Sequence, residues 1–141
     1  MKNKIEEKVS KLIANKAFAV LRLDDEDKAL SVVEALVKGG VKNIEVTLTT
    51  QNPYKVIENV SKEFGKEAII GVGSVVNKEE LIDSINAGAT YVVSPIFNPL
   101  LIDVCHNFGF PIFTGAFSPT EIYNATIAGV DIVNFERNLS V

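Results

Sequence analysis

Regularly spaced glycines are the feature that most constrains the fold of this chain. Each one ends a helix-like segment and precedes an apolar segment, and the successive intervals are 25, 23, 21 and 20 residues, between Gly40, Gly65, Gly88, Gly109 and Gly129. One strand and one helix occupy an interval of this length. The apolar segments are hydrophobic on both faces, as in parallel strands that helices cover. The spacing therefore predicts a parallel α/β sheet made of repeated βα units.

Hydrophobic periodicity and capping residues locate the expected elements. Strands are expected at 17–23, 44–50, 68–76, 91–95, 111–115 and 131–135. A lead-in helix is expected at 4–15, and a second begins after the capping residues Asp24 and Asp25 and stops at Gly39. Asn77 and the capping box Ser118-Pro119-Thr120-Glu121 mark two later helix starts, so that further helices are expected at 53–64, 78–87, 99–107 and 119–128.

Two architectures are compatible with this pattern, an open doubly wound sheet and a β/α barrel. An open sheet usually has a glycine-rich phosphate loop after its first strand, whereas Leu23-Asp24-Asp25-Glu26 is acidic and lacks glycine. The barrel is therefore favoured, although six βα units do not close the usual eight-stranded ring. We expect an incomplete barrel of the (β/α) TIM-barrel type with an N-terminal helix, forming one domain over residues 1–141.

Composition excludes several classes of protein. The chain has 141 residues, 47% of them hydrophobic, which is enough for a core, and a net charge of −4 with no basic stripe argues against nucleic-acid binding. No apolar run approaches the length of a membrane span, and no signal peptide is expected at the polar N-terminus. One cysteine gives no internal disulfide. We expect a cytoplasmic protein with neither a set of metal ligands nor a cofactor.

One strand carries an unusual carboxylate. In Ile44-Glu45-Val46-Thr47-Leu48-Thr49-Thr50, alternation places Glu45, Thr47 and Thr49 on one face and apolar side chains on the other. A carboxylate in a central strand is costly unless water or a partner stabilises its charge. Glu45 is therefore a candidate functional residue.

Polar residues follow the other strands at the ends where α/β proteins place their sites. They are Arg22, Ser74, Ser94 with Pro95, Thr114 and Asn134. Other interpretations stay open: Arg22 can be a surface charge, Gly71-Val72-Gly73 can serve tight packing, and Ser94-Pro95 can simply end a strand. Cys105 and His106 fall on a helix between strands, which disfavours metal binding or Cys–His catalysis.

Several motifs together resemble the 2-keto-3-deoxy-6-phosphogluconate (KDPG) and 4-hydroxy-2-oxoglutarate (KHG) aldolases. The resemblance extends from the first helix to about Val133, and the elements follow in the family's order. Its motifs are Gly39-Gly40-Val41-Lys42-Asn43-Ile44-Glu45-Val46-Thr47, Ile70-Gly71-Val72-Gly73-Ser74-Val75, Val92-Val93-Ser94-Pro95, and Thr114-Gly115 with the capping box. The resemblance implies a class I aldolase on a β/α barrel, in which a lysine forms an imine with a 2-keto acid that is cleaved to pyruvate and an aldehyde.

The resemblance also implies roles for individual residues. Glu45 matches the proton-shuttling glutamate, and Ser74 stands where the family usually has a threonine whose hydroxyl donates to the substrate carboxylate. Pro95 matches the Ser-Pro that lines the pyruvate pocket. Thr49 falls where some members have a carboxylate-binding arginine, and Arg22 on the neighbouring strand can supply that charge. Thr47 lines the same pocket as Thr49.

The sixth strand departs from the family. The family has Asp-Ile-Val-Lys-Phe-Phe-Pro there, whereas this chain has Asn134 at the lysine position and Glu136-Arg137 at the Phe-Pro position. An asparagine amide is not nucleophilic, and imine formation needs an unprotonated amine. Lys16 precedes the first strand, so we expect it at the wrong end of the barrel, and the other lysines fall on helices or turns before strands. We expect 134–141 to be a divergent tail produced by truncation, by a frameshift or by an aberrant gene.

Two function classes follow. The first is a KDPG or KHG aldolase, and the second is a scaffold without the imine lysine that binds 2-keto acids at most. An unrelated open-sheet phosphate binder is a third possibility, which the acidic turn after the first strand disfavours. The expected partner is a small-molecule 2-keto acid. We also expect a homo-oligomer, either the family's trimer or self-association through the open edges of the first and sixth strands.

Overall fold

The computed structural model describes residues 2–135, so most of the expected tail at 134–141, including Glu136 and Arg137, lies outside the described residues. Helices and strands alternate after the first helix. They are α1 (Lys2–Ala14), β1 (Phe18–Leu21), α2 (Ala29–Lys38), β2 (Asn43–Thr47), α3 (Pro53–Phe64), β3 (Ile69–Gly73), α4 (Lys78–Asn86), β4 (Val92–Ser94), α5 (Pro99–Phe108), β5 (Ile112–Gly115), α6 (Pro119–Ile127) and β6 (Ile132–Asn134).

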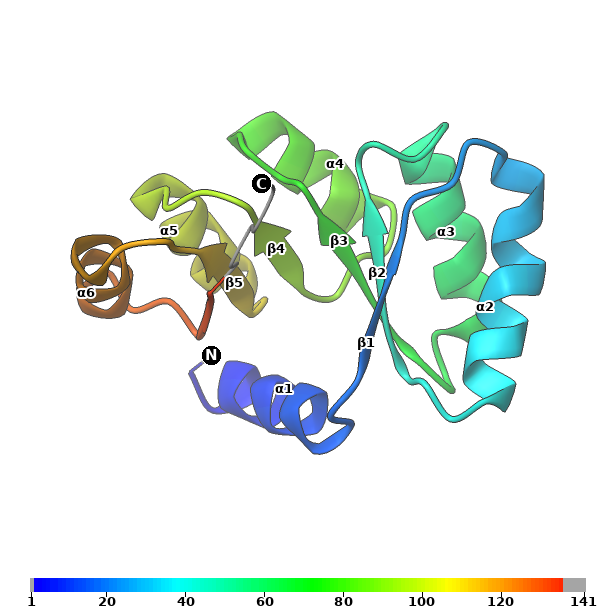
Figure 1. Cartoon of the computed structure of the whole chain (residues 1–141), viewed down its shortest axis with the longest axis horizontal. Helices are drawn as coiled ribbons and strands as arrows, with labels where there is room; N and C mark the ends of the chain where they lie inside the picture. Colours follow the sequence, from blue (N-terminus) through cyan, green and yellow to red (C-terminus); the bar gives the residue numbers. More distant parts are fainter. Residues whose placement is uncertain (1, 136–141) are drawn as a thin grey trace, which may run out of the picture.

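The six strands form one parallel sheet in the order β1-β2-β3-β4-β5-β6, which confirms the predicted βα repetition. The order follows the chain without the reversal that marks a doubly wound sheet. The sheet curls into a half-barrel, with α2 to α6 outside it and α1 across the amino ends of the strands (Figure 1). None of the helices between residues 2 and 135 has the length and apolar character needed to cross a membrane.

The convex face of the sheet packs against the outer helices. Alternate strand residues, such as Ile44 and Val46 on β2 and Ile70 and Val72 on β3, are fully or almost fully buried there. Burying one such side chain contributes about 1.5–3 kcal/mol. This core fixes which residues of each strand face the opposite, concave side.

A smaller cluster covers the lower part of the concave face. Leu12 of α1 packs there with Tyr91, Val93 and Phe113. Phe18 adds edge-on contacts to the rings of Tyr91 and Phe113, with centroids 6.0 and 5.6 Å away. These contacts hold α1 against the amino ends of the strands and leave the carboxyl ends open.

β2 and β3 each end three residues earlier than the sequence predicts. β2 stops at Thr47, because the amide of Thr50 donates to the Thr47 carbonyl at 3.0 Å and turns the chain. The expectation that Thr49 lies on the strand face was therefore wrong, since Thr49 lies in this turn. β3 stops at Gly73, and Ser74 adopts a left-handed backbone with φ of +68°.

Helix caps agree with the sequence at two positions. Asn77 caps α4 by accepting from the Glu80 amide, and Ser118 and Glu121 form the reciprocal capping box of α6. Asp25 instead caps a 3-10 turn at Glu26–Lys28, so α2 begins only at Ala29.

The core makes Cys105 a probe of the folded state. Cys105 is fully buried, and burial, with a smaller contribution from Asp131, raises the pKa of its thiol to about 12. Because the thiolate is the reactive form, we expect native protein at about pH 8 to resist iodoacetamide and urea-unfolded protein to react. Mass spectrometry counts the adduct, and rapid alkylation of native protein would contradict this packing.

Candidate active site

A cavity of about 130 Å³ opens on the concave face near the carboxyl ends of the strands. Six residues that the sequence singles out line it, contributed by β2, β6 and the segments that follow β1, β3 and β4. These are Arg22, Glu45, Thr47, Ser74, Pro95 and Asn134, and Val20 and Val93 complete the described lining. Residues far apart in the chain therefore meet in one small cavity that carries both charge signs and two hydroxyls.

A chain of hydrogen bonds orients Arg22 at the rim of this cavity. The Arg22 Nε–H donates to Thr49 Oγ1 at 3.0 Å, and Thr49 Oγ1 lies 2.8 Å from Thr47 Oγ1. Thr47 donates its own hydroxyl proton to the Leu21 carbonyl at 3.0 Å, so Thr49 is the donor to Thr47. Thr49 is not among the described lining residues of the cavity. Its observed contact is with Arg22, whose guanidinium it holds in place.

Two glycines on β3 provide the space that Glu45 and its neighbour occupy. A Cβ added at Gly73 would overlap Glu45 Oε1, and one added at Gly71 would overlap the ring of Tyr91. Gly71 and Gly73 therefore make room for neighbouring side chains. This packing lets the half-buried Glu45 side chain lie flat across β3 toward the cavity.

Tyr91 is a neighbour of the site that sequence reasoning missed. Its hydroxyl is buried and has no hydrogen-bond partner among the described residues. Burial, and then the Glu45 carboxylate, raise the pKa of Tyr91 well above its usual range, so the phenol stays protonated. The sequence could have indicated this residue through one feature, a tyrosine hydroxyl at the start of the otherwise apolar segment Tyr91-Val92-Val93.

A second cavity of about 440 Å³ occupies the concave face below the first. Glu45 and Asn134 line both cavities, and the second extends to Phe18, Phe113 and Lys16. Lys16 precedes β1, as the sequence indicates, but it lines this cavity together with Glu45. Lys16 therefore lies toward the amino ends of the strands, as expected, and does not line the cavity at the carboxyl ends, but it shares the second cavity with Glu45.

Two other polar residues at the strand ends face away from the site. Ser94 and Thr114 alternate with Val93 and Phe113, so they lie on the helix-covered face, where both are buried. The Ser94 hydroxyl donates to the Ile96 carbonyl at 2.9 Å, which shapes the turn after β4. Neither residue lines the cavity at the carboxyl ends.

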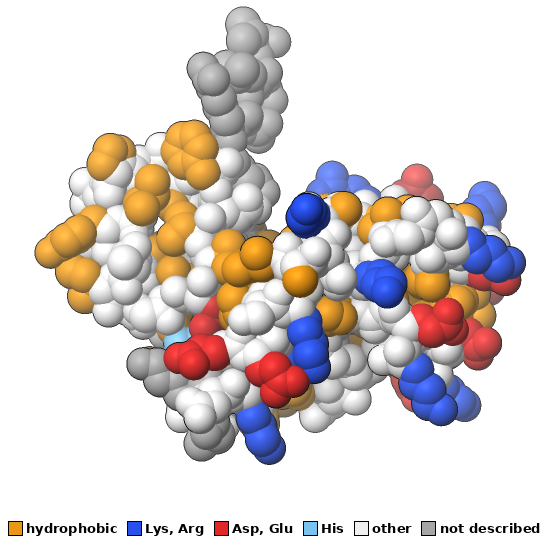
Figure 2. All heavy atoms as spheres, turned by 90° about the horizontal axis from the view of Figure 1, so that it is seen from below, with side chains coloured by type: hydrophobic (Ala, Val, Ile, Leu, Met, Phe, Trp, Pro, Cys, Tyr) orange, Lys and Arg blue, Asp and Glu red, His pale blue; other side chains and the backbone are white. Residues whose placement is uncertain are grey.

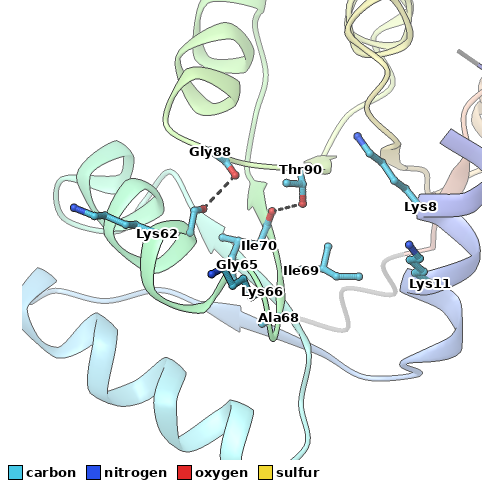
Figure 3. Close-up of a pocket in the computed structure, with 11 residues that line it drawn as sticks. Lys8, Lys11, Lys62, Gly65, Lys66, Ala68, Ile69, Ile70, Gly88 and Thr90 are labelled. Carbon is cyan, nitrogen blue, oxygen red and sulfur yellow. Dashed lines mark hydrogen bonds between the residues drawn. The ribbon is translucent and has the colours of Figure 1, made fainter. Parts of the chain in front are cut away.

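A hollow of about 470 Å³ lies away from this site, near the amino ends of β3 and β4 (Figure 3). Lysines from α1, α3 and the turn after α3 surround it, but their ammonium groups do not converge. Lys8 Nζ donates to the Gly109 carbonyl at 2.9 Å and lies 4.2 Å from the Phe110 ring centroid. Lys11 pairs with Glu7 at 2.8 Å. This arrangement does not form a focused anion site.

The histidine packs as a structural residue. His106 Nε2 lies 3.1 Å from Asp131 Oδ2, which also accepts from the Ile112 amide and so links α5, β5 and the start of β6. Over residues 2–135, His, Cys, Asp and Glu side chains do not gather in groups that could hold a metal ion.

Tyr91→Phe tests the unpartnered hydroxyl. Removing a buried hydroxyl that has no hydrogen bond avoids its desolvation cost, so we expect the free energy of unfolding to rise by about 1 kcal/mol. Urea denaturation measures the change, and Tyr123→Phe, at an exposed tyrosine on α6, is the matched control with no expected effect. A loss of stability in Tyr91→Phe would show that the hydroxyl has a partner.

Comparisons with known proteins identify the family. The family model for KDPG and KHG aldolase matches residues 6–136. The 2-dehydro-3-deoxy-phosphogluconate aldolase of Treponema pallidum is 33% identical over 120 residues, which cover 85% of this chain and 57% of that protein. The KHG/KDPG aldolase of Escherichia coli is 33% identical over 96 residues, covering 68% of this chain and 45% of the relative.

Solved structures agree with these sequence relatives. A native KDPGal structure superimposes with a TM-score of 0.78 at 26% identity, covering 82% of this chain and 56% of that one. The KDPG aldolase of Legionella pneumophila, with pyruvate captured as a covalent carbinolamine intermediate, gives a TM-score of 0.78 at 29% identity. The match covers 84% of this chain and 57% of that one. The chain spans about half the length of the curated relatives that it matches. It belongs to the KDPG and KHG aldolase family.

Proposed function

We propose that this chain acts as an aldolase that cleaves KDPG or KHG to pyruvate and an aldehyde. The observation that carries the proposal is the 130 Å³ cavity, in which Arg22, Glu45, Ser74 and Asn134 face one another in a member of this family. Two further proposals accompany it. The half-barrel is an incomplete TIM-type barrel formed as one domain over residues 1–141, and the chain assembles as the family's trimer.

The substrate carboxylate would bind between Arg22 and Ser74. Thr49 already orients the guanidinium of Arg22, so little side-chain entropy is lost when an anion binds to it. A charge-assisted hydrogen bond from arginine to a carboxylate is about twice as strong as a neutral one. The hydroxyl of Ser74 supplies a second donor, and Pro95 forms an apolar wall beside the methyl group of pyruvate.

Glu45 would move protons. It lines both cavities of the concave face, so its carboxylate can reach a keto acid held by Arg22. Taking a proton from the hydroxyl group of the substrate starts the cleavage of the carbon–carbon bond, and returning a proton to the enamine carbon completes pyruvate. Gly73 keeps this carboxylate in position by leaving room for Oε1.

The amine is the critical requirement of this mechanism. Asn134 cannot attack a carbonyl, and the described lining of the 130 Å³ cavity contains no lysine, so we assign imine formation to Lys16, which lines the adjoining 440 Å³ cavity together with Glu45. Its nitrogen would bond to the keto carbon, and the carbonyl oxygen would leave as water. The carboxamide of Asn134 would then donate a hydrogen bond within the same cavity.

Asn134 also favours a second candidate function, in which the chain binds 2-keto acids without turning them over. An asparagine amide can donate to a keto oxygen but forms no covalent intermediate with it. In this case Arg22 and Ser74 hold the carboxylate as before, and Lys16 stays unmodified.

Trapping with borohydride tests these alternatives. We expect pyruvate and borohydride to add mass to the wild-type chain, with the adduct on Lys16, because reduction fixes an imine as a stable amine. Lys16→Arg should abolish the adduct, whereas Lys11→Arg, at a lysine that lies in a surface ion pair, should retain it. An adduct on another lysine would overturn the assignment of Lys16. If calorimetry detects pyruvate binding but no adduct forms, the second candidate function is supported. If neither binding nor an adduct is detected, both functions are refuted.

Thr49→Val tests the orientation of Arg22. The variant removes the acceptor of the Arg22 Nε–H, so we expect pyruvate to bind about fivefold more weakly, which corresponds to about 1 kcal/mol. Thr49→Ser keeps the hydroxyl and should bind as the wild type does. Calorimetry measures both affinities, and equal affinity of Thr49→Val and Thr49→Ser would show that this hydrogen bond has no role in binding.

A further inference from the structure

The fold does not require the buried hydroxyl of Tyr91. The side chain is completely buried, and its hydroxyl oxygen has no hydrogen-bond partner among the described residues. Burying a hydroxyl without a partner costs free energy, and a phenylalanine ring of the same shape would avoid that cost. A buried polar group of this kind needs an explanation, and a role in function is one such explanation.

The ring that carries this hydroxyl is held on several sides. The ring of Phe18 meets it edge-on with centroids 6.0 Å apart, and the ring of Phe113 lies 5.6 Å away at an interplanar angle of 33°. Leu12 of α1 packs against the cluster from below, and charged side chains of both signs lie on the outer surface of that side (Figure 2). The hydroxyl is therefore held away from bulk water, and a partner has to come to it.

Glu45 occupies a neighbouring position over the same strand. The hydroxyl-bearing end of the Tyr91 ring lies over Gly71, since Cζ is among the ring atoms that a Cβ there would overlap. Gly71 is the residue of β3 that pairs with Glu45 of β2, and the Glu45 carboxylate lies two residues further along, over Gly73. Burial, and then this carboxylate, raise the pKa of Tyr91 well above its usual range. The phenol and the carboxylate are thus neighbours on the concave face of β3.

The Glu45 side chain borders space on both sides of its present position. It is half-buried and lines the 130 Å³ cavity as well as the 440 Å³ cavity. Because Glu45 pairs with Gly71, rotating its side chain back to the level of its own Cα brings the carboxylate beside the ring that covers Gly71. The proposed reaction uses such a movement, since one carboxylate takes a proton from the substrate hydroxyl and returns a proton to the enamine carbon.

We propose that Tyr91 is a positioning residue for Glu45, an inference that rests on the proposed function and deepens it. When the carboxylate turns from Gly73 toward Gly71, the Tyr91 hydroxyl donates a hydrogen bond to it. The phenol keeps its own proton throughout, and the proton that is transferred travels on Glu45. The hydrogen bond favours the charged carboxylate, which is the form that takes a proton from the substrate. Tyr91 therefore acts through Glu45 and contacts no substrate atom.

An NMR titration of the full-length chain, followed at the side-chain carboxyl carbon of Glu45, tests this contact without any substrate. Tyr91→Phe keeps the ring and removes the donor to the charged form, so the titration of Glu45 should move to higher pH by about half a unit, or about threefold in proton affinity. Lys16 and Arg22, the cations that share a described cavity lining with Glu45, are unchanged in this variant. Tyr123→Phe, at an exposed tyrosine on α6, should titrate as the wild type does.

A second measurement follows proton transfer itself. In the wild type we expect the methyl protons of pyruvate to exchange with solvent deuterium, because Glu45 returns a solvent-derived proton to the enamine carbon. Tyr91→Phe should slow the maximal rate of this exchange about tenfold. The pyruvate concentration that gives half the maximal rate should stay within about twofold of the wild-type value, since Arg22 and Ser74 hold the carboxylate of pyruvate.

The two measurements separate this inference from the proposed function. An unchanged titration of Glu45 in Tyr91→Phe would overturn the inference, as would an equal shift in Tyr123→Phe. A shifted titration with an unchanged exchange rate would refute the positioning role. If the titration shifts in Tyr91→Phe but the wild type exchanges no pyruvate protons, the contact between Tyr91 and Glu45 stands and the proposed function fails.

Discussion

The alternation of side chains along parallel strands is the constraint on which the rest of this structure depends. On β2, Ile44 and Val46 are completely buried beneath the outer helices, and this burial fixes the direction of Glu45 and Thr47. Rotating the strand by one residue would expose two large aliphatic side chains and bury a carboxylate, at a cost of several kcal/mol. The hydrophobic core thus determines where the polar groups of the concave face lie.

The candidate site also requires space on the concave face for two large side chains. Glu45 and Tyr91 are large side chains on β2 and just before β4, and both extend over β3 between them. β3 accommodates them because Gly71 and Gly73 have no side chains at these positions. The same packing explains a high phenol pKa, since Tyr91 is buried beside the Glu45 carboxylate. A pair of glycines that looks like a weak motif in the sequence therefore sets the shape of the candidate site.

The sequence predicted features correctly where a single local pattern, such as residue spacing or the burial of a charge, determines the structure. The glycine spacing gave the parallel βα repetition, and burial logic singled out Glu45. It failed where strand ends or register mattered, because these depend on backbone contacts between distant residues. Thr49 left the strand through a turn at Thr47, and Ser94 and Thr114 face the helices. Lys16 was set aside because of its place before β1, and it lines the lower cavity of the concave face with Glu45 but not the cavity at the carboxyl ends.

Under the proposed function, the concave face binds a 2-keto acid near the carboxyl ends of the strands. Titration of isotope-labelled protein with pyruvate, followed by amide chemical shifts, tests it most directly. We expect saturable shifts at Arg22, Glu45, Thr47, Ser74 and Asn134, all of which line one cavity. Shifts confined to the lysine-lined hollow around Lys62 and Lys66, or no saturable shift at all, would contradict the claim.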